Sequence, residues 1–156
     1  MEDTMRHIKI VGALIPLFFV AAMSGQEVSN PAGSTVRVNV YRYKQYAGSA
    51  IRPSIYVDEK DVARLQSGRY VVLALAPGKH TFRSTDKRSE IDLELKTGQE
   101  YYIRMDMMAG TWKGAGLLTL VMPEQGAGEL KQTKPIDAGM VKDKEFLAAD
   151  FEPTKK

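Results

Sequence analysis

The sequence contains no cysteine, and this absence removes three kinds of chemistry. Disulfide bonds and thiolate metal sites are impossible, and so is a lipid anchor attached to a cysteine after an apolar leader. A folded domain must therefore be stabilised by its own core. The chain has 156 residues, of which 44% are hydrophobic and 26% charged, so one ordinary globular domain is expected.

Histidine is almost as scarce, since only His7 and His80 are present. A single histidine in the domain cannot supply the ligands that zinc requires, and the Gly-x-Ser-x-Gly pattern of a serine hydrolase is absent. We therefore expect no metal site, no cofactor and no enzymatic activity, with a small hydrolase of unrecognised site as the alternative. His80 follows a Pro-Gly-Lys turn, where we expect it to bond a nearby carbonyl group or shield the turn.

Three further segments resemble ligand sites only weakly. The run from Asp58 to Asp61 has the acids of a calcium loop but lacks its glycine. Met105, Met107 and Met108 could bind copper(I) through sulfur, but Met105 and Met107 share one strand face, so filling the core is the simpler role. The segment 110–116 is rich in glycine without the spacing of a phosphate-binding loop. Trp112 at its centre is either a contact residue or folded back onto the domain.

The chain also lacks any block of basic residues. Its net charge is only +3, and charges of both signs alternate along the sequence. Nucleic-acid binding is therefore not expected.

Residues 1–24 have the organisation of a secretory signal peptide. A basic stretch ends at Lys9, an uncharged apolar run extends over 10–23, and Ala22-Met23-Ser24 places small residues at the cleavage positions. The alternative is an uncleaved membrane anchor, but the run is shorter than the roughly 20 apolar residues that a spanning helix needs. We expect an exported protein, periplasmic or extracellular, whose translation starts at Met1 or Met5.

From Ser34 onward the hydrophobic pattern predicts about eight short strands joined by tight turns. Alternation is clearest at Val36, Val38 and Val40 and again at Ile91, Leu93 and Leu95. The other predicted strands cover 54–58, 62–65, 69–75, 80–84, 101–108 and 116–122. Because no helical pattern of useful length separates them, the fold class is all-β, an antiparallel β-sandwich or small open barrel over 34–131.

Turns and the C-terminal region complete this prediction. Gly68 and the Pro77-Gly78 pair are expected to form tight turns, the latter closing a hairpin. A short helix is predicted over 123–132, weakened by Gly126 and Gly128. Residues 132–156 are polar with sparse apolar residues, and we expect a tail that docks loosely or frays.

The middle of the chain resembles a bacterial family of exported proteins catalogued as domain of unknown function 2846. The similarity is carried by five segments: Val40-Tyr41-Arg42, Gly48-Ser49-Ala50, residues 52–58, Gly68-Arg69-Tyr70 and residues 75–81. Residues 55–65 and 74–82 are also similar to PEGA-type β-modules of bacterial surface proteins. The resemblance implies a prealbumin-like β-sandwich without an established activity. Glycine, common in the family at position 59 or 60, is missing here, so we expect a looser or longer loop.

The first predicted strand offers a candidate binding face. If its valines face the core, then Arg37, Tyr41 and Tyr43 face outward, close to Tyr46. Tyrosine next to arginine can bind a protein or an anionic glycan. The alternative is that a second sheet or the C-terminal tail covers this face and buries Tyr41 and Tyr43. We therefore expect a non-catalytic, envelope-associated interaction domain whose partner is an envelope protein or a glycan. A carbohydrate-binding module is a further alternative.

Overall fold

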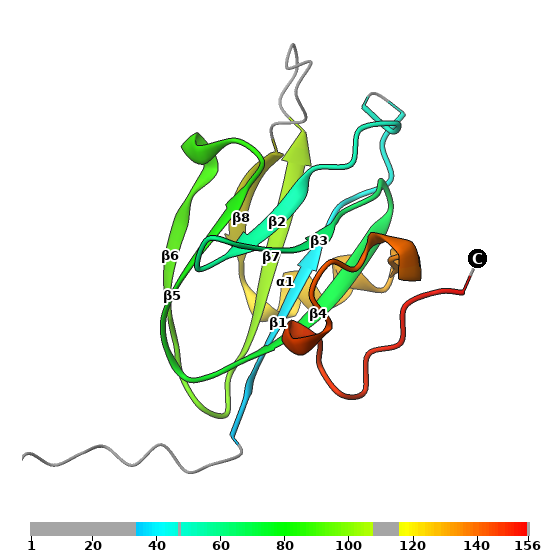
Figure 1. Cartoon of the computed structure of the whole chain (residues 1–156). Coiled ribbons are helices and arrows are strands. Elements are labelled where there is room, and N and C mark those ends of the chain that lie inside the picture. The colour runs from blue at the N-terminus through cyan, green and yellow to red at the C-terminus, as the bar shows by residue number, and fades with distance from the viewer. Residues whose placement is uncertain (1–33, 47, 108–115, 156) are drawn as a thin grey trace, which may run out of the picture.

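The computed structural model describes residues 34–46, 48–107 and 116–155. These residues form nine strands in two sheets packed face to face, with one short helix (Figure 1). The strand order is β8-β7-β1-β4-β9 in the first sheet and β3-β2-β5-β6 in the second. The fold is therefore an all-β sandwich, and this part of the sequence prediction is confirmed.

The elements lie close to their predicted positions. The first sheet consists of β1 (Val36–Tyr41), β4 (Arg69–Leu75), β7 (Glu100–Met107), β8 (Gly116–Val121) and β9 (Lys134–Pro135). The second consists of β2 (Ser54–Val57), β3 (Lys60–Arg64), β5 (Gly78–Ser84) and β6 (Ile91–Leu95). The helical elements are η1 (Lys87–Ser89), α1 (Pro123–Leu130), η2 (Ala138–Met140) and η3 (Lys144–Phe146).

The core lies between the two sheets. Val36, Val38 and Val40 of β1 are at most 1% exposed and belong to one cluster with Ile55 of β2 and Phe82 of β5. Each buried valine contributes about 1.5 kcal/mol or more through loss of water contact. The alternation in the sequence therefore reports the inner face of this strand correctly.

Pairing within the first sheet is mixed rather than purely antiparallel. Strand β1 is antiparallel to β4 and parallel to β7, and β9 is parallel to β4. The hairpin expected at Pro77-Gly78 is wrong, because β4 and β5 belong to different sheets. The turn instead carries the chain from one sheet to the other, with Gly78 at φ 129°. Parallel pairing and sheet crossing depend on strands far apart in the chain, so local turn signals do not reveal them.

The loosely docked tail expected over 132–156 is also wrong. Ile136 is fully buried and Phe151 is 8% exposed, with its ring 5.7 Å from that of Tyr70. The backbone N–H of Ala148 bonds the carbonyl of Val72 on β4, and that of Lys142 bonds Val62 on β3. The segment runs beside β4 and β3 in Figure 1, orange to red, and closes that side of the sandwich. A few anchoring apolar residues and backbone bonds suffice to fix a polar sequence.

Helix α1 covers the outer face of the first sheet. Tyr41 and Tyr102 of the sheet form a second apolar cluster, against which Ala127 and Leu130 of the helix pack. Gly126 permits this close approach, because a Cβ at that position would overlap the side chain of Tyr102. Within residues 34–46, 48–107 and 116–155, no helix is long and apolar enough to cross a bilayer.

Candidate functional site

Helix α1 covers the centre of the binding face predicted on β1. Tyr41 is 0% exposed, because α1 lies over it and the Glu129 carboxylate accepts a hydrogen bond from its hydroxyl at 2.5 Å. Tyr43 is half-buried, and its ring lies edge-on to Tyr41 with 6.2 Å between centroids. The expectation that these tyrosines face outward together is wrong for Tyr41. The covering helix begins about 80 residues later in the chain, beyond the reach of a pattern within one strand.

Glu129 is the centre of a polar network beneath α1. Besides Tyr41, it accepts a hydrogen bond from Gln125 at 2.7 Å, and its carboxylate lies 3.4 Å from the guanidinium of Arg104. Burial acts to raise the pKa of Glu129, but these hydrogen bonds and the neighbouring cation outweigh it, so the pKa is lowered. Burial and the same carboxylate raise the pKa of the Tyr41 phenol. The helix is therefore fixed on the sheet by a hydrogen bond from the neutral phenol of Tyr41 to the carboxylate of Glu129.

The remaining candidates on this face are separated from one another. Arg37 bonds Asp150 at 2.7 Å and Glu100 at 3.2 Å, so its charge is already paired. Tyr46 is 100% exposed, on the loop between β1 and β2. Trp112 lies outside the described residues. Among the predicted aromatic residues that the structure describes, only Tyr46 has a fully exposed side chain.

His80 and Asp58 together fix the β2–β3 turn against β5. The Nδ1 atom of His80 lies 2.7 Å from the Asp58 carboxylate, and Nε2 lies 2.9 Å from the carbonyl oxygen of Ala76. Asp58 also accepts the backbone N–H of Thr81 at 3.0 Å. Both ring nitrogens thus have partners within the fold. No three histidine, aspartate or glutamate side chains converge as metal ligands anywhere in the described part of the chain.

The expected looser loop after β2 is wrong. Asp58 and Glu59 alone connect β2 to β3, with φ of 49° and 67°, and Val57 pairs directly with Lys60. Two residues with positive φ are the pattern of a type I′ hairpin, which normally favours glycine or asparagine. The two carboxylates offset the strain, because Asp58 bonds β5 and Glu59 pairs with Arg83 at 2.8 Å. Gly68 has φ 72° in the turn before β4, as a tight turn requires.

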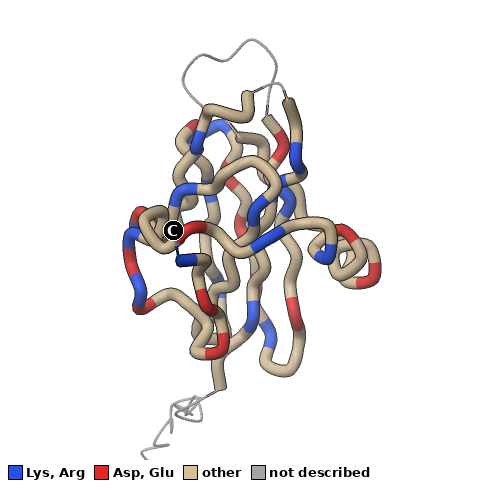
Figure 2. Tube along the Cα trace, turned by 90° about the vertical axis from the view of Figure 1, so that its right-hand side faces the viewer, with Lys and Arg blue, Asp and Glu red and all other residues tan. Residues whose placement is uncertain are grey.

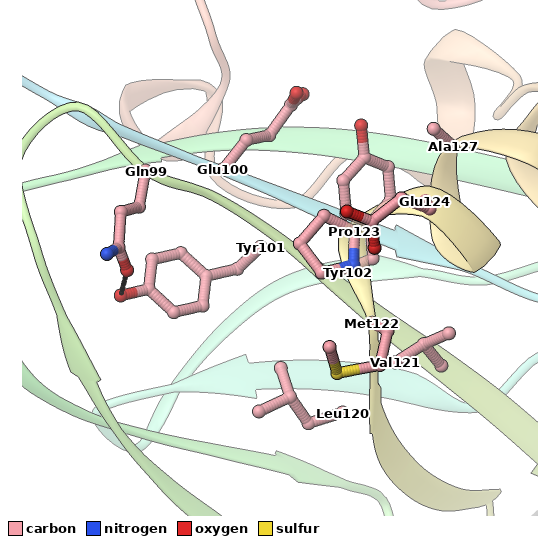
Figure 3. Close-up of a pocket in the computed structure, with 10 residues that line it drawn as sticks. All are labelled: Gln99, Glu100, Tyr101, Tyr102, Leu120, Val121, Met122, Pro123, Glu124 and Ala127. Atoms are coloured by element: carbon pink, nitrogen blue, oxygen red, sulfur yellow. Dashed lines mark hydrogen bonds between the residues drawn. The ribbon is translucent and has the colours of Figure 1, made fainter.

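An apolar pocket of about 720 Å³ lies where β8 leads into α1 (Figure 3). It is lined by Gln99, Glu100, Tyr101, Tyr102, Leu120, Val121, Met122, Pro123, Glu124 and Ala127. Figure 3 shows Leu120 and Met122 side by side, with Tyr102 next to Pro123 and Glu124. Tyr101 is fixed at the other end by hydrogen bonds to Gln99 and to the Glu94 carbonyl. An apolar cavity of this size with a few polar groups is typical of a binding site.

A second pocket of about 570 Å³ lies at the opposite end of the sandwich. It is lined by Lys44, Gln45, Tyr46, Ser49, Arg52, Gln66, Ser67 and Arg69. Several of its lining residues belong to the β1–β2 loop, which is at the top of Figure 1, whereas the β6–β7 turn, which lines the apolar pocket, is at the bottom. The six residues of β1 separate the two ends by about 20 Å. Elsewhere, acidic and basic residues are interspersed along the trace (Figure 2).

Sequence reasoning missed most residues of both pockets. The segment 116–122 predicts an apolar strand, but nothing in it indicates that Leu120 lies on a sheet edge. Lys44, Arg52 and Arg69 are spread over three segments that meet only through the fold. The proximity of Tyr46 to basic residues was the one available signal.

The chain matches the model of a protein family over residues 32–116, which is more than half of its length. The family is described as "Protein of unknown function (DUF2846)". The chain belongs to this family. The matched DUF2846 region extends from just before β1 to the first residue of β8. It includes every residue that lines the second pocket, which we call the basic pocket because Lys44, Arg52 and Arg69 line it. Helix α1 and the C-terminal segment lie beyond it.

A relative of the DUF2846 chain is an uncharacterized protein of Haemophilus influenzae. The two are 24% identical over 117 residues, which cover 73% of this chain and 69% of the relative. No solved structure matches the chain. The family match relates the region from β1 to β7 to other chains and assigns it no activity.

Proposed function

We propose that this protein is a non-catalytic interaction module that binds an extended segment of a partner protein along β8. One observation carries the proposal. Of the four large hydrophobic side chains exposed in the described residues, three lie on β8 or directly after it: Leu117 at 44%, Leu120 at 49% and Met122 at 69%. Exposed apolar side chains gathered on one element are typical of interaction sites.

The two open sides of the sandwich support this location by their difference. On the side of β3 and β4, the chain's own C-terminal segment adds β9 and further backbone bonds. On the other side, β8 is the edge of its sheet. Among the described residues, its backbone forms strand pairing only with β7, and Gly116 also bonds the hydroxyl of Ser84. An unpaired edge with apolar side chains is suited to the addition of a strand from another chain.

The apolar pocket suggests what the partner's segment presents. Leu120 and Met122 are both on the exposed edge and in the pocket lining, so a strand beside β8 would place a side chain there. The two side chains of the lining that carry a charge at neutral pH, Glu100 and Glu124, are both acidic. Glu100 already pairs with Arg37, which leaves Glu124 for a partner. The segment that fits best is an apolar residue flanked by lysine or arginine.

A site-specific crosslinking experiment tests the proposal. A photoreactive amino acid at position 120 should give one crosslinked species in intact cells, and the same group at the exposed Lys131 should give none. In a second arm, the photoreactive group is placed at position 122. Leu120→Lys should then abolish the crosslinked product, because a charge on an edge strand opposes pairing with another strand. Leu120→Met keeps an apolar side chain and should retain the product. Equal products at positions 120 and 131 would contradict the proposal, as would a product that consists of two copies of this chain.

Export is part of the same proposal. The basic start, apolar run and small residues of the segment 1–24 support removal of a signal peptide. We infer an envelope location from this segment and from the resemblance to PEGA-type surface modules that we propose for residues 55–65 and 74–82. The intact mass of protein from the periplasmic or extracellular fraction should lack residues 1–24. A full-length mass in the membrane fraction would show that the segment is an anchor instead.

A further inference from the structure

The pocket beside Tyr46 has an unusual charge composition. Three of its lining residues, Lys44, Arg52 and Arg69, are cationic, and none is acidic. Arg69 is partly satisfied, because it pairs with Asp137 at 3.3 Å and donates to the carbonyl of Pro135 at 2.8 Å. Lys44 and Arg52 are exposed, and neither forms an ion pair with any described residue. The pocket therefore has a net positive charge from two cations that are available to a ligand.

The loop that carries these groups is built around a buried cation. Arg42 is 0% exposed, and its guanidinium donates to the carbonyls of Gly48 and Ile51, both at 2.8 Å. Burying a guanidinium is costly unless it is hydrogen-bonded. These two hydrogen bonds therefore hold the backbone of the loop around Arg42. Ser67 adds a second constraint, since its hydroxyl accepts the N–H of Gln45 and donates to the carbonyl of the same residue. The lining is therefore held in place before any ligand arrives.

Tyr46 adds an aromatic face to this charged pocket. Its side chain is 100% exposed, which is unusual for a large aromatic residue. Tyrosine rings pack against apolar faces of ligands and keep a hydroxyl in water. The side chains of Gln45 and Ser49 are exposed in the same pocket and can bond hydroxyl groups. Cations, amide and hydroxyl groups and one aromatic ring together match the chemistry of a charged sugar.

We propose that this pocket binds an acidic saccharide, with its anionic group at Lys44 and Arg52 and a sugar ring against Tyr46. Lysine and arginine bind carboxylate, phosphate or sulfate through charge-assisted hydrogen bonds. The volume of about 570 Å³ lies within the range of ordinary small-molecule sites. This site is separate from β8, so it can be correct even if the partner proposed there is wrong.

Titration of the purified protein with defined probes tests the assignment. Trigalacturonic acid should bind with an affinity that falls as salt is added, and neutral maltotriose should bind at least tenfold more weakly. Arg52→Gln and Lys44→Gln should each weaken trigalacturonate binding about tenfold, the value of one charge-assisted hydrogen bond. Tyr46→Ala should weaken it about fivefold. Lys131→Gln is the control and should leave the affinity unchanged, and all variants should keep the melting temperature of the parent.

Other outcomes would overturn the proposal. Inorganic phosphate that binds as tightly as trigalacturonate, with no effect of Tyr46→Ala, would show a simple anion site. Tighter binding of a single-stranded oligonucleotide, lost in the same three variants, would assign the pocket to nucleic acid. Maltotriose that binds equally well would show that the cations play no part, and no saturation at millimolar trigalacturonate would exclude the acidic saccharide.

Discussion

Gly126 of α1 lies directly against the side chain of Tyr102 on β7, with no room for a methyl group between them. Gly126→Ala should therefore move the helix or the tyrosine and lower the free energy of unfolding by about 1–3 kcal/mol, the usual cost of overpacking. Urea denaturation monitored by circular dichroism measures this change.

Gly128 supplies the matched control for this substitution. Apart from the backbone of the helix and the two neighbouring residues, no atom lies within 4 Å of a Cβ at position 128, two residues further along the same helix. Gly128→Ala should raise the free energy of unfolding by up to about 1 kcal/mol, because alanine is the better helix former. If both substitutions were stabilising, the contact between Gly126 and Tyr102 would not be as close as described.

The free energy of unfolding should depend on pH in the acidic range through the titration of Glu129. Its pKa is lower in the fold than the ordinary value of 4.5, so the folded state binds a proton less readily than the unfolded state. The stabilisation is complete above about pH 4.5 and is lost as the pH falls through the folded-state pKa. Glu129→Gln should flatten this part of the pH profile. Glu145→Gln, at an exposed position, should leave the profile as it is.

Arg42→Met should open the loop between β1 and β2. The methionine fills much of the buried space but leaves the carbonyls of Gly48 and Ile51 without their donor. We expect a loss of about 2 kcal/mol in stability and faster amide hydrogen exchange over residues 48–52. Exchange that stays slow in the variant would mean that the loop is held by other contacts.

Asp58→Ala should destabilise the β2–β3 hairpin by about 2 kcal/mol. The variant loses the hydrogen bonds to His80 and to the N–H of Thr81, and it places alanine at positive φ. Asp58→Asn should cost less, because asparagine tolerates this conformation and keeps an acceptor oxygen. Thermal melting of the two variants side by side would reveal the difference, and an identical loss would show that the charge alone matters.

Ile136→Ala tests whether the C-terminal segment belongs to the domain. The side chain is fully buried, so its truncation should lower the free energy of unfolding by about 2–5 kcal/mol. Lys142→Ala, at an exposed position of the same segment, should change it by less than about 0.5 kcal/mol. A neutral Ile136→Ala would indicate that the segment frays from the sandwich in solution.

Some features of this fold depend on adjacent residues and others on residues far apart in the chain. The strands at Val36–Tyr41 and Ile91–Leu95 could be predicted because alternation is a property of adjacent residues. The burial of Tyr41 could not, since it depends on Glu129, 88 positions away. For the same reason the basic pocket was missed, because its cations come together only when the β1–β2 loop and the start of β4 are both in place. The tight Asp58-Glu59 turn was not predicted for another reason. Its backbone strain is offset by contacts with β5, which the local sequence does not reveal.

The central position of β1 has a consequence for how the chain folds. Asn39 bonds Glu100, 61 positions later, and Arg37 bonds Asp150, 113 positions later. Pairings between such distant residues require large loops to close before they yield any stabilisation, and proteins dominated by them fold in milliseconds to seconds. Strand β1 therefore gains its full set of partners only after β7 and the C-terminal segment are available. We expect the chain to stay unfolded until nearly all of it has been synthesised, a state in which a secretion channel that accepts only unfolded chains could take it.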